Sequence, residues 1–362
     1  MGRILDEMTR AARAGSDRPT LLDPPSTPNA LPRTLTPMRP RLAQEGFNSP
    51  DHLFELKWDG IRALVSNDQA GLRIVDRNGG DLLPAIPELR TLRLPLGTLL
   101  DGEIIVCDSR GRPNYDLLVG RLGPKASKRG KGPLFVAFDL LYDAGRSVLG
   151  LPLERRRERL LARGLPQKGL VVPEHLENDG EPFLEVVAEY ELEGVVAKRR
   201  DGRYVPGTRS ADWLKCLVSP RADVVIGGLV LDERRGARAL LCGWMNDNGA
   251  LTYAGEAYVP PYLGEWVDAA TRSFRTDGSP FLGPFPLRPG MVWLRPRLVA
   301  IVDHESVERG VLVDARFRAL RFDARTDDCR IEEPVEVPEY PPIGGTDRPR
   351  LVVLHSLPFR FD

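Results

Sequence analysis

The segment Glu55–Arg62 has the sequence Glu-Leu-Lys-Trp-Asp-Gly-Ile-Arg and is flanked by two apolar stretches, 54–56 and 62–66. Asp-Gly is a strong turn signal, so Lys57 is expected at the end of a strand that enters a tight turn. A lysine amine that is neutral when it attacks is a nucleophile, and nucleotide transfer also needs a nearby carboxylate and metal ion to manage phosphate charge. On its own, the segment also fits a surface hairpin with a solvated lysine.

Lysine is scarce in this chain. Of 51 basic residues only seven are lysines, namely Lys57, Lys125, Lys128, Lys131, Lys168, Lys198 and Lys215. Arginine stays protonated and cannot serve as an amine nucleophile, so each lysine is more informative than usual. Residues 121–131 form a Gly-rich basic loop without an acidic residue, which fits either a solvated surface loop or a contact to a phosphate backbone.

Composition limits the class of protein. The hydrophobic and charged fractions are 42% and 28%, as in a globular protein. No apolar run approaches the roughly 20 residues of a membrane helix, and no secretory signal is visible, so a cytoplasmic protein without a membrane partner is expected. The four cysteines form no Cys-x-x-Cys pair, which argues against a zinc site or a disulfide framework. The net charge of zero does not indicate a nucleic-acid partner.

Local patterns predict four regions along the chain. They are an irregular Pro/Arg-rich arm (1–45), a first domain (46–218), a second domain (219–330) and a Pro-rich tail, either an ordered strap or loose (331–362). Strands are expected at 54–56, 62–66, 72–76, 99–106, 134–142, 194–198, 212–218, 222–232, 239–244, 250–259 and 291–302. Helices are expected at 153–163, 182–190 and 261–274. The strands and single helix of the second domain suit a five-stranded barrel such as an OB-fold.

Further motifs follow Lys57 in order. They are Arg77-Asn78-Gly79, Asp101-Gly102-Glu103-Ile104, Phe138-Asp139, Glu193-Gly194-Val195-Val196-Ala197-Lys198 and Trp213-Leu214-Lys215. This order resembles the collinear motifs of the covalent nucleotidyltransferase superfamily, which comprises DNA ligases, RNA ligases and mRNA-capping guanylyltransferases. Within it, the sequence is most similar to stand-alone bacterial ATP-dependent ligases of the C type and to the ligase module of ligase D, over about 54–323.

The resemblance implies a fold and a nucleotide site. The fold would be α+β, with a nucleotidyltransferase (ATP-grasp-like ligase) domain of antiparallel sheets and flanking helices, followed by an OB-fold β-barrel. Lys57 would receive AMP, Arg62 and Glu103 would hold the ribose hydroxyls, and Phe138 would stack on the adenine. Glu55 is also placed among the nucleotide-binding residues. Phe138 lies in an apolar run and equally fits a core position.

The remaining motif residues would act on phosphate and metal. Glu193 would bind the catalytic metal, helped by Asp59 or Asp101. Lys198 and Lys215 would contact the α-phosphate, where negative charge grows in the transition state. Arg77 would take the 5′-phosphate at the nick. Glu193 and Lys198 also fit an exposed pair at a strand end, and Asp139 also fits a structural role.

Two positions depart from the family pattern. After Lys215 the family has a second lysine two positions on, where this chain has Leu217. Near the end of the second domain, ligases carry Arg-x-Asp-Lys, which orients the pyrophosphate during self-adenylation; this chain has Arg321, Asp323 and then Ala324. Losing one such electrostatic contact typically slows a reaction by ~10²–10³-fold. These two departures leave two alternatives open: self-adenylation at a reduced rate, or self-adenylation at a rate that is ordinary for a ligase.

We therefore expect an ATP-dependent DNA ligase that seals 3′-OH/5′-phosphate nicks in double-stranded DNA through a lysyl-AMP on Lys57, in DNA repair or end joining. Its cofactors would be ATP and Mg²⁺ or Mn²⁺. It would act as a monomer, with end-joining or repair proteins as candidate partners. Alternatives are an RNA ligase, a capping-type guanylyltransferase, or a nick- or end-binding homologue that has lost turnover.

Overall fold

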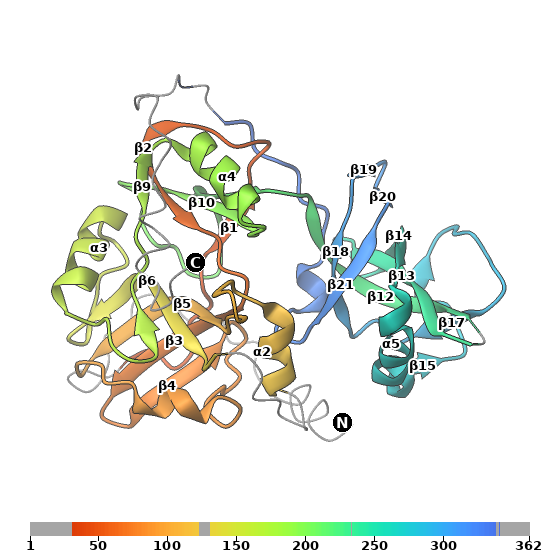
Figure 1. Cartoon of the computed structure of the whole chain (residues 1–362), viewed down its shortest axis with the longest axis horizontal. Coiled ribbons are helices and arrows are strands. Elements are labelled where there is room, and N and C mark those ends of the chain that lie inside the picture. The colour runs from red at the N-terminus through yellow and green to blue at the C-terminus, as the bar shows by residue number, and fades with distance from the viewer. Residues whose placement is uncertain (1–30, 123–130, 233, 338–339, 341–362) are drawn as a thin grey trace. The chain divides into compact units, whose positions relative to one another are not determined.

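The computed structural model describes residues 31–122, 131–232, 234–337 and 340, which divide into two units (Figure 1). Unit 1 runs to Val218 and resumes at Pro334, and unit 2 is Ser219–Glu333. No helix within these described ranges is long and apolar enough to cross a membrane.

Unit 1 contains two sheets. The first has the order β1-β11-β10-β2-β9, with β1 (Arg39–Leu42), β11 (Arg209–Leu217), β10 (Gly194–Arg199), β2 (Ser49–Leu56) and β9 (Leu176–Asn178). The second has the order β4-β3-β5-β6-β7, with β4 (Gly71–Asp76), β3 (Ile61–Asp68), β5 (Thr98–Ile105), β6 (Leu134–Asp143) and β7 (Arg146–Ser147), and β8 (Leu170–Val171) also pairs with β6. The turn that contains Asp59 and Gly60 joins one sheet to the other.

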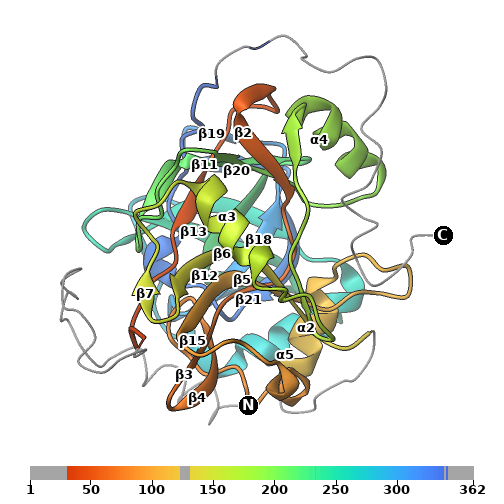
Figure 2. The same cartoon turned by 90° about the vertical axis from the view of Figure 1, so that its left-hand side faces the viewer.

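Helices cover these sheets. They are α2 (Tyr115–Leu122), α3 (Leu153–Ala162), α4 (Gly180–Glu189) and the 3-10 helix η1 (Pro87–Thr91). The helix α3 packs on β6 (Figure 2). The helix α4 packs on β10 and β2, where Phe183 and Val187 join Phe54, Val195 and Ala197 in one buried cluster. One face of the first sheet is thus filled by apolar side chains, and the opposite face is left for polar ones.

In unit 2 the strand pairings form a closed ring. The ring strands are β12 (Arg221–Asp232), β13 (Gly236–Met245), β14 (Leu251–Tyr258), β21 (Arg316–Arg321) and β18 (Val299–Asp303). Each pairs with the next, β14 with β21 in parallel, and β18 pairs back to β12. An apolar cluster that includes Val224, Leu240 and Phe317 fills this unit.

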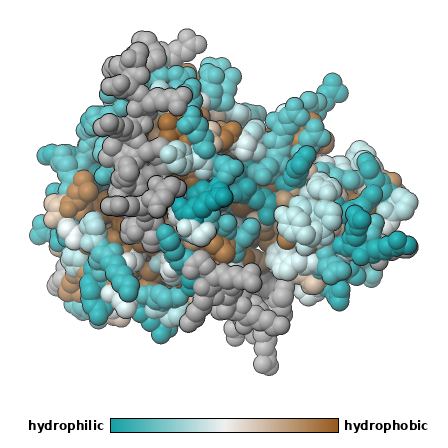
Figure 3. Space-filling view, viewed as in Figure 1, coloured by the Kyte–Doolittle hydropathy of each residue, from teal (hydrophilic) through white to brown (hydrophobic). Residues whose placement is uncertain are grey.

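Shorter elements complete unit 2. They are β15 (Arg275–Thr276), β16 (Phe281–Leu282), β17 (Met291–Leu294), β19 (Ser306–Glu308), β20 (Val311–Val313), α5 (Gly264–Thr271), and the 3-10 helices η2 (Pro261–Leu263), η3 (Arg272–Phe274) and η4 (Thr326–Asp328). The helix α5 packs on β13. The surface over α5, β15 and β17 is mainly teal and pale in Figure 3, so few strongly hydrophobic residues gather there in this view.

The structure differs from the sequence prediction at several places, among them the ring strand β21, which was missed. At its start, the tail follows the predicted alternative of an ordered strap. Residues 31–45 were expected to be irregular, but β1 pairs in parallel with β11 and Met38 is fully buried. The strand expected at 291–302 is divided into β17 and β18, because Pro296 between them has no N–H to donate to a ladder. The helix α2 was missed. The tail returns to unit 1, where Val335 bridges Ala43; residues 341–362 lie outside the described part.

Candidate active site

The predicted motifs meet on one face of the first sheet. Across β10, Val196 is paired with Glu55 of β2 on one side and with Lys215 of β11 on the other. Side chains alternate along a strand, so residues two apart share this face. The face is formed by Glu55, Val196, Lys198, Trp213, Lys215 and Leu217. Lys57 follows β2 directly, and its N–H donates to the Gly194 carbonyl at 2.8 Å.

Lys57 and Glu193 are the centre of the site. The Nζ atom of Lys57 lies 2.7 Å from Oε1 of Glu193, and their side chains are 25% and 12% exposed. The turn after Lys57 is fixed by Gly60, where an added Cβ would lie 2.2 Å from the Ile104 carbonyl oxygen. No side chain larger than hydrogen fits there, so the Asp-Gly turn is held against β5. A partly exposed amine beside a carboxylate is what nucleotide transfer to lysine requires.

Phe138 owes its position to a β-bulge in β6. Asp101 is opposite Asp139 and Gly102 is opposite Ala137, so Phe138 is the extra residue between them. Bulges turn a side chain away from the regular alternation and are frequent at active sites. The ring is 7% exposed. The Arg62 guanidinium carbon lies 4.7 Å from the ring centroid.

Asp101, predicted to help bind the metal, is paired within the protein. It is fully buried, and both of its oxygens accept hydrogen bonds from Arg62, each at 2.6 Å. The Tyr204 hydroxyl donates a further bond at 2.6 Å. Burial alone would lower the pKa of Arg62, but the adjacent Asp101 charge raises it above the ordinary value. Asp101 therefore orients Arg62.

Lys198 is paired within the protein, and its contact to the α-phosphate stays a prediction. Its Nζ donates to Oε2 of Glu55 at 2.8 Å and lies 4.2 Å from the Phe138 ring centroid, and Lys198 is only 2% exposed. Glu55 also accepts a bond from Arg157 at 2.5 Å. Burial lowers the pKa of Lys198, and the Glu55 charge offsets part of this effect. These contacts make Lys198 and Glu55 the buried floor beside Phe138, and the alternative of an exposed Glu193–Lys198 pair is wrong.

The other predicted residues of unit 1 lie on the strands β5 and β11 and in two turns. Glu103 is directly opposite Arg62 on β5, so their side chains share a face. Lys215 is half-buried on the same face as Lys198. Asp59 is half-buried in the turn after Lys57, and Arg77 begins the turn after β4. Both are polar residues at chain reversals, where a ligand can approach.

Arg321 belongs to unit 2, at the end of β21. It binds Asp323 through two hydrogen bonds of 2.9 Å, and Asp323 is 3% exposed. Ala324, where the family has lysine, packs partly buried against an apolar cluster of the same unit. In the basic loop, Arg121 is 7% exposed and donates to Glu88 and to the Lys131 carbonyl, so it supports the fold. Residues 123–130 of that loop lie outside the described part.

Sequence reasoning missed three side chains around the site. Arg156 and Asp139 form a fully buried pair with two bonds of 2.8 Å, which bears out a structural role for Asp139. Arg157 supports Glu55, and Tyr204 supports Asp101. The available signal was Asp139 itself, because a carboxylate within an apolar strand needs a buried partner.

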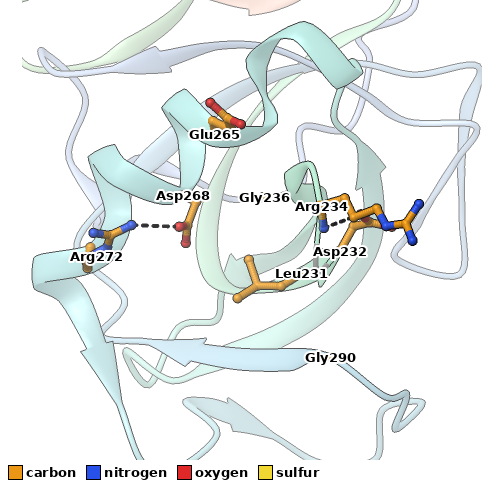
Figure 4. Close-up of a pocket in the computed structure, with 8 residues that line it drawn as sticks. All are labelled: Leu231, Asp232, Arg234, Gly236, Glu265, Asp268, Arg272 and Gly290. Atoms are coloured by element: carbon orange, nitrogen blue, oxygen red, sulfur yellow. Dashed lines mark hydrogen bonds and ion pairs between the residues drawn. The ribbon is translucent and has the colours of Figure 1, made fainter.

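A pocket in unit 2 is separate from these motifs. It is lined by Leu231, Asp232, Arg234, Gly236, Glu265, Asp268, Arg272 and Gly290 (Figure 4). Two of its charged residues pair with each other, since Arg272 donates to Asp268 at 3.1 Å. It contains none of the predicted site residues.

Comparisons with known proteins agree with this geometry. The family model described as the ATP dependent DNA ligase domain matches residues 39–216. A solved structure of mycobacterial DNA ligase D complexed with ATP and MES has a TM-score of 0.57 and 34% identity, covering 82% of this chain and 98% of that one. The fold is thus the nucleotidyltransferase fold of ATP-dependent ligases, built mostly of sheet with few helices.

Curated relatives extend the match. DNA ligase C1 of Mycolicibacterium smegmatis is 34% identical over 312 residues, which are 79% of this chain and 89% of the relative. The multifunctional non-homologous end joining DNA repair protein LigD of Mycobacterium tuberculosis is 36% identical over 296 residues, which are 78% of this chain. The chain spans 38% of the length of that LigD. This chain belongs to the ATP-dependent DNA ligase family.

Proposed function

We propose that this chain joins DNA nicks in three steps, with Lys57 as the nucleophile. The single observation that carries the proposal is the 2.7 Å contact between Lys57, which directly follows β2, and Glu193, which directly precedes β10. In the first step, Nζ of Lys57 attacks the α-phosphorus of ATP and gives up a proton. The bond to the β-phosphate oxygen breaks, and pyrophosphate leaves as AMP is attached to the lysine.

The later steps return Lys57 to its free form. An oxygen of the 5′-phosphate at the nick attacks the phosphorus of the lysyl-AMP, so the P–N bond breaks and AMP is transferred to the DNA end. The 3′-hydroxyl then attacks the 5′-phosphorus, a phosphodiester forms, and AMP leaves. Arg77 is proposed to hold the 5′-phosphate, where its planar fork suits phosphate oxygens.

We propose a nucleoside site between Phe138 and the polar face of the first sheet. Phe138 would stack on the adenine, and Arg62 and Glu103, which share a face, would hold the ribose hydroxyls. Lys215 would contact the α-phosphate. Lys198 and Glu55 would shape the pocket from below and keep Phe138 in place, since their ion pair lies against its ring.

The residues present fit a divalent cation. Mg²⁺ is held by one or two carboxylates together with water and substrate phosphates; Glu193 beside Lys57 would supply one such carboxylate, and Asp59, two residues after Lys57, would supply the second. Mg²⁺ or Mn²⁺ bound there would neutralise charge on the phosphates. We further propose that unit 2 is an OB-fold, which the closed ring of five strands and the helix between β14 and β18 support. We also propose that the chain acts in end joining or repair, which the printed name of the relative LigD supports, and that it does so as a cytoplasmic monomer.

Mass spectrometry after incubation with ATP and Mg²⁺ tests the proposal. The expected result is one AMP on the peptide that contains Lys57, and none on Lys57→Ala. A parallel incubation with GTP separates an adenylyltransferase from a guanylyltransferase, and nicked DNA compared with nicked RNA separates the two kinds of ligase. AMP on Lys198 or Lys215 would overturn the assignment of the nucleophile. A folded protein that carries no AMP would identify a binding homologue without turnover.

A further inference from the structure

Tyr204 lies in the connection between β10 and β11, outside the recognised motifs, and is 2% exposed. Its hydroxyl donates to Oδ2 of Asp101 at 2.6 Å and accepts from the backbone N–H of Met38 at 3.0 Å. Burial, and the charge of Asp101, raise the pKa of Tyr204 well above its ordinary value. The phenol therefore stays protonated and remains a donor to the carboxylate.

Arg62 closes the network from the other side. It donates through Nε and a terminal nitrogen to Asp101, and the same terminal nitrogen donates to the Met38 carbonyl at 3.0 Å. Tyr204, Asp101, Arg62 and Met38 thus form a closed ring of hydrogen bonds. Met38 and Asp101 are both fully buried, so water does not replace a bond that is lost.

The ring is anchored independently of any ligand. The aromatic ring of Tyr204 packs edge-on against that of Trp213, with 5.7 Å between the ring centroids. The backbone N–H of Tyr204 donates to the Leu149 carbonyl. Nearby, Arg156 donates to the Gly202 carbonyl at 3.0 Å. The connection that carries Tyr204 is therefore held in place, and its hydroxyl is a fixed point for Asp101.

We propose that Tyr204 is a positioning residue for the ribose of the bound nucleotide. With the Met38 backbone, it holds the Asp101 carboxylate so that the Arg62 guanidinium faces the nucleoside site next to Phe138. The inference rests on the proposed adenylation by Lys57 and deepens it. Met38 lies one residue before the span that matches the family model, so the support for Arg62 extends beyond that span.

Loss of the hydroxyl has a specific consequence. In Tyr204→Phe the ring keeps its packing, but Asp101 loses one of its three donors and Met38 loses an acceptor. Arg62 then has a partner that can rotate. Selectivity for a nucleotide that carries a ribose hydroxyl falls when the side chain that binds this hydroxyl is no longer fixed. The reason is that the geometry of a buried hydrogen bond decides how much the bond contributes to binding. Recognition of the ribose weakens, while the reacting atoms at Lys57 keep their arrangement.

The test compares ATP with 2′-deoxyATP and 3′-deoxyATP in single-turnover self-adenylation of the full chain. For wild type, kcat/KM is measured with all three nucleotides. The selectivity ratio is kcat/KM with ATP divided by kcat/KM with the deoxy analogue that the enzyme discriminates against. Tyr204→Phe is expected to lower this ratio about 10-fold, mainly through a higher KM for ATP, with kcat changed less than 3-fold. Arg62→Lys should lower it similarly, and the double variant no further.

Two controls separate positioning from stability. Tyr142 is half-buried and packs against the apolar cluster that contains Tyr204. Tyr142→Phe removes its hydroxyl and should leave the selectivity ratio unchanged. Asn48→Ala removes two hydrogen bonds between the buried Asn48 and Glu181, away from the Tyr204 network, and should lower the unfolding midpoint without altering the ratio. An unchanged ratio in Tyr204→Phe, or an equal loss with ATP and both analogues, would overturn the proposal. A wild type that forms no adenylate would instead count against the proposed function.

Discussion

The Nζ atom of Lys57 lies 2.7 Å from Oε1 of Glu193, although the two residues belong to different ends of unit 1 in sequence. They meet because Lys57 leaves β2 just where Glu193 enters the neighbouring β10. The contact places the proposed nucleophile beside the carboxylate that is proposed to bind the metal ion.

Glu193→Gln should slow self-adenylation by about 100-fold or more, because the neutral amide neither pairs with the Lys57 ammonium nor binds a divalent cation well. Glu191→Gln is the matched control: it lies two residues earlier, is exposed, and pairs with Arg112. Single-turnover transfer of labelled AMP measures both. Equal rates for wild type and Glu193→Gln at saturating Mg²⁺ would rule out this role.

Lys198→Met should act mainly on stability. It leaves the Glu55 carboxylate buried with only Arg157 as partner, and breaking one side of a buried pair costs roughly 3 kcal/mol. Urea unfolding measures the cost, and Glu55→Gln in the same chain should recover part of it. If Lys198 contacted the α-phosphate as the resemblance implied, adenylation would fall while the free energy of unfolding stayed constant.

Leu217→Lys should accelerate self-adenylation. Leu217 pairs with Gly194 and shares the sheet face of Lys215, so the new cation would stand where negative charge develops in the transition state. Val218→Lys, one residue on, is the control for added charge, and Ala324→Lys tests the second family departure. A level or reduced rate for Leu217→Lys would mean that an arginine already compensates for the missing lysine.

Unit 1 should lose stability in mild acid through His52. Burial, and secondarily the charge of Arg199, lower the pKa of His52 from 6.5 to about 4. The unfolded chain therefore takes up a proton as the pH falls below 6.5, while the folded one resists until about pH 4, so stability declines across this window by up to about 3 kcal/mol. His52→Gln should flatten that part of the urea-midpoint profile. Identical profiles for the two proteins would contradict the assignment.

Much of the order of elements was predictable, because apolar runs, turn residues and helix starts are local. The strands around Lys57 and the helices α3 and α4 lie close to their predicted ranges. Strand β1 was missed because its partner β11 is remote in sequence and its own composition is rich in proline and arginine.

The site was predictable by residue type but not by pairing. Lys57, Glu193 and Phe138 follow from the motifs, yet nothing local reveals that Phe138 is a bulge residue. Nor does the sequence reveal that Asp101 faces Arg62, since cross-strand register decides both. For the same reason, the motif of Lys198 does not reveal its buried partner Glu55 on the neighbouring strand β2.

The β-bridge between Ala43 and Val335 forms late during synthesis of the chain, because Val335 follows the whole of unit 2. The ribosome delivers all of Ser219–Glu333 before Val335 emerges, so the second unit is synthesised in full while the first still lacks its last contact. At 5–20 residues per second this delay is on the order of ten seconds, long compared with the folding of a small domain. A nascent chain stalled before Val335 would expose the edge of β1. A chaperone would therefore bind most readily in the interval before Val335 is synthesised.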